Sequence, residues 1–257
     1  MSKQELLKKA DYYKGMIEAD NSHKNEFKKS LGDCFKLKCI YGSGSIEGNT
    51  LGLTDIRILL EDGITVEGKP VKDYYLASGH AQAYDYMLSL ATTEQFDISE
   101  DTIRKLHYLY YHRVDHEKAG QYRNTPANLA ASDYLPPVPE DLAHLMGHFI
   151  NQIQSSRMLL HPIEYAALCH KRLLDIYPFE SGNGIVARLL LNLILINEGY
   201  GMAVIAPKHQ DEYLNGLYMS RIKNNPDIDP LVKLVAELVV DSQIEYCKLQ
   251  GIEIARN

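Results

Sequence analysis

The sequence has 257 residues, of which 45% are apolar and 24% are charged, and its net charge at pH 7 is −7. This composition is typical of a globular protein with a substantial core, and it argues against a disordered or fibrous chain. The acidic balance and the lack of a basic tract argue against nucleic-acid binding. The longest apolar run, Leu189–Ile196, is too short to cross a membrane.

The N-terminal segment lacks the apolar centre of a secretory signal. The four cysteines are scattered and show neither zinc nor CxxC spacing. We therefore expect a cytoplasmic protein with reduced thiols and no metal site.

Helical periodicity dominates the chain from its first residues. Apolar residues recur at helical spacing over 4–41, with an interruption near 20–22. Ser99 is a suitable N-cap, Gly199 suits the position just beyond a helix end, and Pro230 suits a first helical turn. We expect further helices over 102–112, 142–153, 163–176, 186–198 and 230–249.

The stretch 124–139 is the clearest exception to this helical pattern. It contains four prolines, a density that excludes helix and tolerates only edge strand or loop. No internal repeat and no linker divides the chain. The patterns predict one compact all-α unit with a small extended segment.

A glycine-rich loop at 177–184 lies between two apolar helices. Pro178 ends the first helix, and Gly-Asn-Gly at 182–184 leads into the second. Glycines let backbone N–H groups turn inward, and a helix N-terminus adds partial positive charge, so the loop is suited to bind a phosphate. Arg188, one helical turn further on, is expected to face the same anion. The other interpretation is an ordinary turn between two helices.

The residues at 161–200 resemble the core of the Fic family, whose motif reads H-P-F-x-[DE]-G-N-[GK]-R-x-x-R. Gly-Gln-Tyr-Arg at 120–123 and Leu-Pro-Pro at 135–137 resemble the entry and the exit of that family's target-docking flap. Residues 68–74 resemble a further family segment. The resemblance therefore extends over most of the chain.

This resemblance implies a particular domain layout and activity. We expect a helical region over 1–95, a Fic core over 96–257 and a β-hairpin flap near 121–139. The family consists of protein adenylyltransferases, which transfer AMP from ATP with the help of Mg²⁺. The nucleotide-binding residues implied by the motif are Phe179, Ser181, Gly182, Asn183, Gly184 and Arg188.

Three motif positions depart from the family pattern. Tyr177 stands where the family has its general base, a histidine, and a phenol with a pKa near 10 is a poor base. Ser181 stands where an acidic residue would hold Mg²⁺, and Ile185 replaces the first motif arginine. We therefore expect AMP transfer to be absent or very slow. ATP with Mg²⁺ is the cofactor that the resemblance implies, and we expect the protein to bind it weakly.

Residues 43–48 (Ser-Gly-Ser-Ile-Glu-Gly) match the family's inhibitory motif. Its place before the Fic core resembles the second inhibitory class, in which the glutamate binds the second motif arginine. Glu47 and Ser43 are thus the inhibitory residues, and Arg188 is the expected partner of Glu47. A glutamate in a last helical turn needs such a cation. The other interpretation is a surface glutamate in a glycine-rich loop.

The flap implies a protein partner, because family flaps pair with an extended target segment through backbone hydrogen bonds. The residues expected to take part are Arg123, Asn124, Thr125, Leu135 and Pro136. The other interpretation is an ordinary surface loop. The many apolar helices are also compatible with a homodimer.

Three functional hypotheses remain open from the sequence, the blandest of which is an inert fold kept for dimerisation. In the first, the chain is a degenerate Fic protein that acts by binding a nucleotide or a peptide. In the second, it is an enzyme with altered chemistry that transfers or removes another phosphate-containing group, with Tyr177 as acceptor. His170 is an alternative base, but it lies about 10 Å further down the same helix, so a structural role is expected.

Overall fold

The computed structural model describes residues 1–20, 24–93, 97–127 and 134–253, and in these residues the fold is all α-helical, as predicted. Ten α-helices and two short 3₁₀ helices are present, and the described ranges contain no strand. The helices are α1 (Lys3–Asp20), α2 (Lys24–Ile46), α3 (Leu53–Asp62), α4 (Val71–Ala91), α5 (Glu100–Tyr111), η1 (Pro139–Asp141), α6 (Leu142–Ser156), α7 (Pro162–Ile176), α8 (Asn183–Asn197), η2 (Pro207–His209), α9 (Gln210–Met219) and α10 (Asp229–Gln250).

The expected β-hairpin of the flap is not seen. Residues 121–127, the entry limb, and 134–138, the exit limb, are irregular. The tip predicted between them falls on 128–133, which lies outside the described residues. The prolines of the exit limb explain its lack of ladder hydrogen bonds, since proline has no N–H to donate.

The predicted helix ends are confirmed. The Ser99 hydroxyl accepts a hydrogen bond from the Thr102 N–H at the start of α5 (3.1 Å). Gly199 follows α8 with a φ of 79°, which is left-handed, and Pro230 lies in the first turn of α10. Local residue chemistry therefore sets these boundaries.

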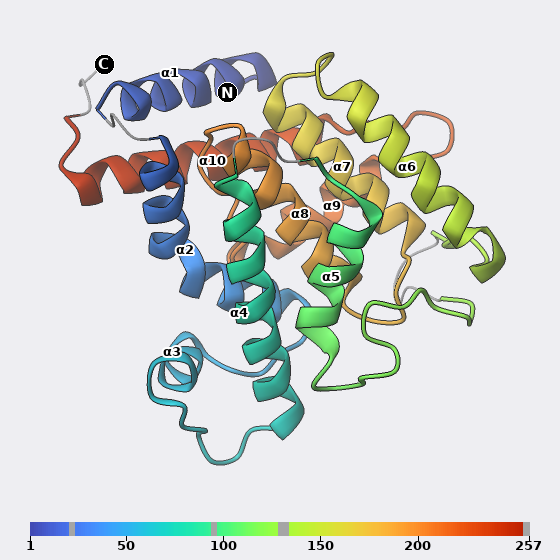
Figure 1. Cartoon of the computed structure of the whole chain (residues 1–257). Coiled ribbons are helices and arrows are strands. Elements are labelled where there is room, and N and C mark those ends of the chain that lie inside the picture. The colour runs from blue at the N-terminus through green and yellow to red at the C-terminus, as the bar shows by residue number, and fades with distance from the viewer. Residues whose placement is uncertain (21–23, 94–96, 128–133, 254–257) are drawn as a thin grey trace.

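Helix α8 is the centre of the molecule. Every residue from Asn183 to Ile196 is buried, and α8 contacts α7, α4, α2 and α5 (Figure 1). Because α8 begins at the loop 177–184, the loop sits on an element that is enclosed on all sides. This burial fixes the position of any side chain in the first turns of α8.

The N-terminal helix packs against the C-terminal one. Figure 1 shows α1 lying along α10, and the contacts between these two helices agree. A single hydrophobic cluster contains residues of both 1–95 and 96–257. None of the helices that the structure describes combines the length and apolar character that a membrane crossing needs.

Candidate functional site

The loop 177–184, called the motif loop below, begins with an unusual backbone conformation. Tyr177 is the C-cap of α7 with φ 51° and ψ 58°, and within the described ranges no other non-glycine residue has a positive φ. Its N–H donates to the Leu173 carbonyl (3.0 Å) and closes the last turn of α7. The side chain of Asn183 accepts from the Phe179 N–H (2.9 Å) and donates to the Phe179 carbonyl (2.7 Å). The loop is therefore held by its own polar groups.

His107 fixes the motif loop from the side of α5. Its ring stacks on Phe179, with centroids 3.9 Å apart and planes 4° apart. The Gly120 N–H donates to Nδ1 (2.8 Å), so Nε2 carries the proton and donates to the Ser181 carbonyl (3.0 Å). Burial lowers the pKa of His107 to about 4, so the ring is neutral at pH 7. Phe179, one of the nucleotide-binding residues implied by the motif, is fully buried in the core.

The three departures from the motif lie in different environments. Tyr177 is partly buried; burial raises the pKa of its phenol above the ordinary value of 10, and the charge of Glu47 raises it further. The side chain of Ser181 is exposed, and Ile185 is fully buried in the core. The loop therefore lacks a basic side chain at Tyr177 and a cation at Ile185.

The donor atoms around the motif loop do not fit Mg²⁺, which prefers carboxylate oxygens in octahedral geometry. Glu180, the acidic residue of the loop, is paired with Lys118 (2.6 Å) on the surface. In the described part of the chain, no three His, Cys, Asp or Glu side chains gather in a group that could hold a metal ion.

Arg188 lies in the first turns of α8 and is almost completely buried. Its Nη2 donates to Glu47 Oε1 (2.7 Å) and to the Ser43 carbonyl (3.1 Å). Its Nε donates to the Ser43 hydroxyl (2.6 Å), and its Nη1 donates to the Tyr213 hydroxyl (3.3 Å). The predicted contact between Glu47 and Arg188 is therefore present, and every nitrogen of the guanidinium has a partner.

The glycines of the motif loop make room for these contacts. A Cβ on Gly184 would lie 2.0 Å from Glu47 Oε1 and 3.0 Å from Arg188 Nη1. A Cβ on Gly182, whose φ is 78°, would lie 2.6 Å from the Tyr110 ring. The Glu47 carboxylate thus sits against the first turn of α8, where the helix dipole favours negative charge.

The chain beyond Glu47 is anchored to the start of α4. Gly48 adopts a φ of 83° after the end of α2. The Thr50 N–H and hydroxyl both donate to Asp73 Oδ2 (2.9 and 2.6 Å), and the Asn49 amide donates to the Asp73 carbonyl (3.0 Å). Asp73 belongs to the segment 68–74 noted in the sequence. The position of Glu47 is therefore fixed on both sides.

The sequence did not single out Tyr213, which supports Arg188 from α9. Its hydroxyl contacts both Arg188 Nη1 (3.3 Å) and His170 Nε2 (3.0 Å). Burial, reinforced by the charge of Arg188, lowers the pKa of His170 to about 3. His170 is therefore a neutral core residue, as its distance from Tyr177 along the helix suggested.

Arg123 holds both limbs of the flap against the end of α7. It is buried, and its guanidinium donates to the carbonyls of Tyr177 (2.8 Å), Thr125 (2.9 Å) and Pro137 (2.6 Å). Its side chain therefore faces inward. The side chains of the other residues expected at the flap, Asn124, Thr125 and Leu135, are exposed, and that of Pro136 is partly exposed.

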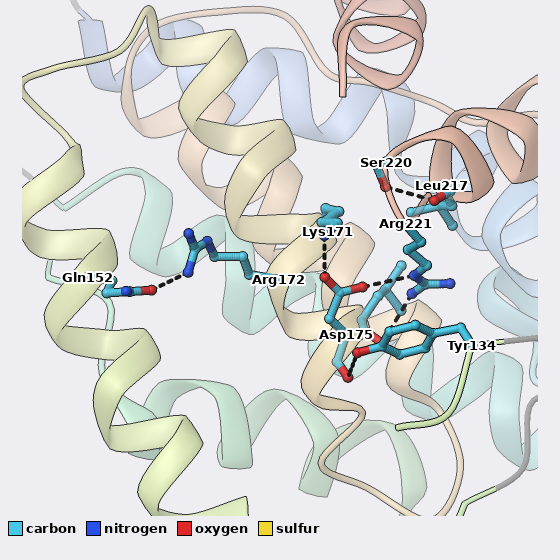
Figure 2. Close-up of polar contacts among 9 residues, drawn as sticks. Tyr134, Gln152, Lys171, Arg172, Asp175, Leu217, Ser220 and Arg221 are labelled. Atoms are coloured by element: carbon cyan, nitrogen blue, oxygen red, sulfur yellow. Dashed lines mark hydrogen bonds and ion pairs between the residues drawn. The ribbon is translucent and has the colours of Figure 1, made fainter. Parts of the chain in front are cut away.

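A second set of contacts holds the exit limb (Figure 2). The Tyr134 hydroxyl donates to the Asp175 carbonyl (2.9 Å), and the guanidinium of Arg221 lies 4.4 Å from the centroid of the Tyr134 ring. Arg221 Nε donates to Asp175 Oδ1 (2.8 Å), and Lys171 Nζ pairs with Oδ2 (2.5 Å). Neither Arg221 nor Tyr134 carried a signal in the sequence, because their partners come from distant segments.

Comparison with known proteins places these features in a family. A family model described as Fic/DOC matches residues 97–195, which include the motif loop, α5 to α7 and most of α8. Protein adenylyltransferase Fic of Nematostella vectensis is 33% identical over 234 residues, which are 91% of this chain and 53% of that protein. The Aedes aegypti protein of the same name is 33% identical over 202 residues, 78% of this chain and 40% of that protein. The chain thus spans about half the length of these curated relatives, or less.

Solved structures show the same architecture. A Fic domain containing signaling protein from Bacteroides thetaiotaomicron superposes with a TM-score of 0.85 at 27% identity, covering 97% of this chain and 99% of that one. Fic-1 from C. elegans (residues 134–508) gives a TM-score of 0.84 at 25% identity, covering 97% of this chain and 73% of that one. With the motif loop, the family match and these neighbours in agreement, the chain is a Fic family protein related to the protein adenylyltransferases.

Proposed function

We propose that this protein is a Fic scaffold in which AMP transfer is disabled and which acts by binding an extended protein segment at the flap. The observation that carries the proposal is the state of Arg188. Its Nε, Nη1 and Nη2 all have partners within the chain, and Glu47 neutralises its charge. A nucleotide phosphate must displace Glu47 before it meets this cation.

The chemistry of transfer lacks its other groups as well. AMP transfer joins a target hydroxyl oxygen to the α-phosphorus of ATP and expels pyrophosphate, so the hydroxyl proton needs an acceptor. The Tyr177 phenol, with its raised pKa, is not such an acceptor at neutral pH. Loss of a general base costs about 10²- to 10⁴-fold in rate, and loss of one group that stabilises transition-state charge, here the arginine replaced by Ile185, costs about 10²- to 10³-fold.

The flap keeps what docking requires. The exit limb is non-helical, and the side chains of Leu135 and Val138 are 77% and 54% exposed. Arg123 holds Thr125 and Pro137 at a fixed separation from the end of α7. Recognition through backbone hydrogen bonds and pockets for alternate side chains needs none of the missing catalytic groups. Pro136 lies on the same limb as these exposed residues, and the exposed Asn124 lies on the entry limb.

The test is a restoration experiment with ATP labelled at the α-phosphate, in Mg²⁺ and in Mn²⁺. We expect no label on the wild-type protein and none on Glu47→Gly alone, because freeing Arg188 does not supply a base. The variant Glu47→Gly/Tyr177→His/Ser181→Asp/Ile185→Arg is expected to label itself. A folded quadruple variant that stays unlabelled would contradict the assignment of the missing groups.

The same assay, run in parallel with ATP labelled at the γ-phosphate, decides the alternative of an enzyme that transfers another phosphate-containing group. Label on the wild-type protein that disappears in Tyr177→Phe would show that Tyr177 accepts a group, and it would overturn the binding-only proposal. A thermal-shift titration with ATP measures nucleotide binding in the same variants. We expect ATP to raise the Tm of Glu47→Gly and to leave that of the wild-type protein unchanged, because a ligand stabilises the folded state only when its concentration approaches or exceeds its Kd.

A further inference from the structure

Two sets of contacts described above meet on one short helix. Tyr213, in the first half of α9, contacts Arg188, the partner of Glu47. Arg221, just beyond the end of α9, contacts Asp175 and stacks on Tyr134 of the exit limb. Arg221 lies eight residues after Tyr213, which corresponds to about 12 Å if the chain continues at helical rise. One element therefore touches both the flap and the inhibitory pair.

The end of α9 is firmly joined to Arg221. The Arg221 N–H donates to the Tyr218 carbonyl (2.9 Å), and the Ser220 hydroxyl donates to the Leu217 carbonyl (2.7 Å; Figure 2). Arg221 Nη2 also donates to the Leu174 carbonyl in the last turn of α7 (3.3 Å). Arg221 is therefore bonded both to the last turn of α9 and to the last turn of α7.

We propose that Arg221 is a positioning residue through which α9 couples the exit limb of the flap to the Glu47–Arg188 pair. When the exit limb is seated, Tyr134 lies on the Arg221 guanidinium and Asp175 holds that guanidinium in place. Arg221 then fixes α9 so that the Tyr213 hydroxyl supports Arg188. This proposal does not require AMP transfer or a docked partner, so it stands or falls independently of the proposed function.

The coupling is a free energy between two sites, so it must be measurable from either end. Hydrogen exchange monitored by mass spectrometry or NMR gives both readouts. The reporters are the amide of Asp141, which donates to the Val138 carbonyl at the end of the exit limb (3.2 Å), and the amides of Glu47, Gly48 and Asn49, which donate to the Gly44 and Ser45 carbonyls at the end of α2. Slow amides of α10 serve as the reference for global unfolding.

We expect Arg221→Ala to accelerate exchange at both reporter sites by about fivefold or more relative to the reference, the low end of typical coupling. Glu47→Gln, a perturbation at the other end, is expected to accelerate exchange at the exit limb as well. Arg221→Lys retains a charge without the planar fork and is expected to recover part of the protection. Tyr134→Phe keeps the stacked ring and loses the bond to Asp175, so its effect is expected to be smaller than that of Arg221→Ala.

Arg172 supplies the matched control. It lies on α7 near Asp175 but bonds to Gln152 of α6, away from the exit limb (Figure 2). Arg172→Ala is expected to change neither reporter. Faster exchange at the exit limb alone in Arg221→Ala would overturn the coupling, and unchanged exchange at both sites would show that Arg221 positions neither.

Discussion

Replacement of Glu47 by glutamine removes a charge from an almost isosteric side chain and leaves Arg188 with its other partners. The side chain of Arg188 is 5% exposed and that of Glu47 is 33% exposed, so the pair lies between two known limits. Exposed pairs contribute about 0.2–1 kcal/mol, whereas removal of one partner from a buried pair costs about 3–5 kcal/mol. Ser43 and Tyr213 still accept bonds from the guanidinium, so we expect a loss of about 2 kcal/mol in the free energy of unfolding.

This loss is read as a fall in Tm of about 4–8 °C, since 1 kcal/mol corresponds to about 2–4 °C in a chain of this size. Asp85→Asn is the matched control, because Asp85 pairs at 2.6 Å with Lys36 of α2, the helix that ends just before Glu47, and the Asp85 side chain is 59% exposed. We expect the control to lose about 0.5 kcal/mol or less, and to lose even that in high salt, which screens exposed charges more than buried ones. Urea unfolding of both variants at low and high salt gives the two free energies.

The reasoning is refuted if Glu47→Gln is as stable as the wild-type protein, or if both variants lose the same amount. Either result would mean that Glu47 does not stabilise the fold through Arg188. A loss at Glu47 that vanishes in high salt would equally show an exposed contact in place of a buried one.

Gly184→Ala is expected to lower the free energy of unfolding by about 1–3 kcal/mol, because its Cβ would overlap Glu47 Oε1. The loss should be clearly smaller in a Glu47→Ala background. Equal losses in the two backgrounds, measured by urea unfolding as a double-mutant cycle, would contradict this packing. The pKa of His107 is about 4 in the folded protein, below its ordinary value of 6.5. As the pH falls, the unfolded chain therefore takes up a proton before the folded one does. The free energy of unfolding should fall by up to about 3 kcal/mol between about pH 6.5 and about pH 4. His107→Phe keeps a ring on Phe179 without titrating, so its stability should fall less steeply across that window in urea titrations at a series of pH values. Arg123→Ala is expected to lower the free energy of unfolding in urea by about 3 kcal/mol, since three carbonyls lose a charged donor. Arg123→Lys should recover less than half of this loss. Arg113 is exposed, and Arg113→Ala should stay within about 0.5 kcal/mol of the wild-type protein.

The sequence predicted those parts of the fold that have a local cause. Helices with one apolar face and recognisable ends, such as α5 with Ser99 and α10 with Pro230, were found because periodicity and caps are properties of neighbouring residues. Helix α4 was missed because it is buried on several sides and therefore shows no single apolar face. It even contains Gly79, which weakens a helical pattern but is required here, since a Cβ there would lie 2.1 Å from the Tyr110 carbonyl of α5.

The same distinction between local and distant causes separates the contacts of the candidate site that the sequence predicted from those it did not. The contact between Glu47 and Arg188 was predicted because each residue lies in a short motif and the charges need one another. The role of His107 was not predicted, because its partners Gly120 and Ser181 are 13 and 74 residues away. Nothing in the neighbourhood of a histidine in sequence indicates which distant backbone groups it will meet.

The left-handed backbone at Tyr177 has a consequence for how far this chain stands from an active relative. A bulky aromatic residue seldom adopts this conformation, whereas histidine adopts it several-fold more readily than most other side chains. The main chain is therefore already shaped for the side chain that transfer chemistry demands, and exchanging the phenol for an imidazole carries no conformational penalty. The backbone at this position therefore sets no barrier to the Tyr177→His exchange of the restoration experiment.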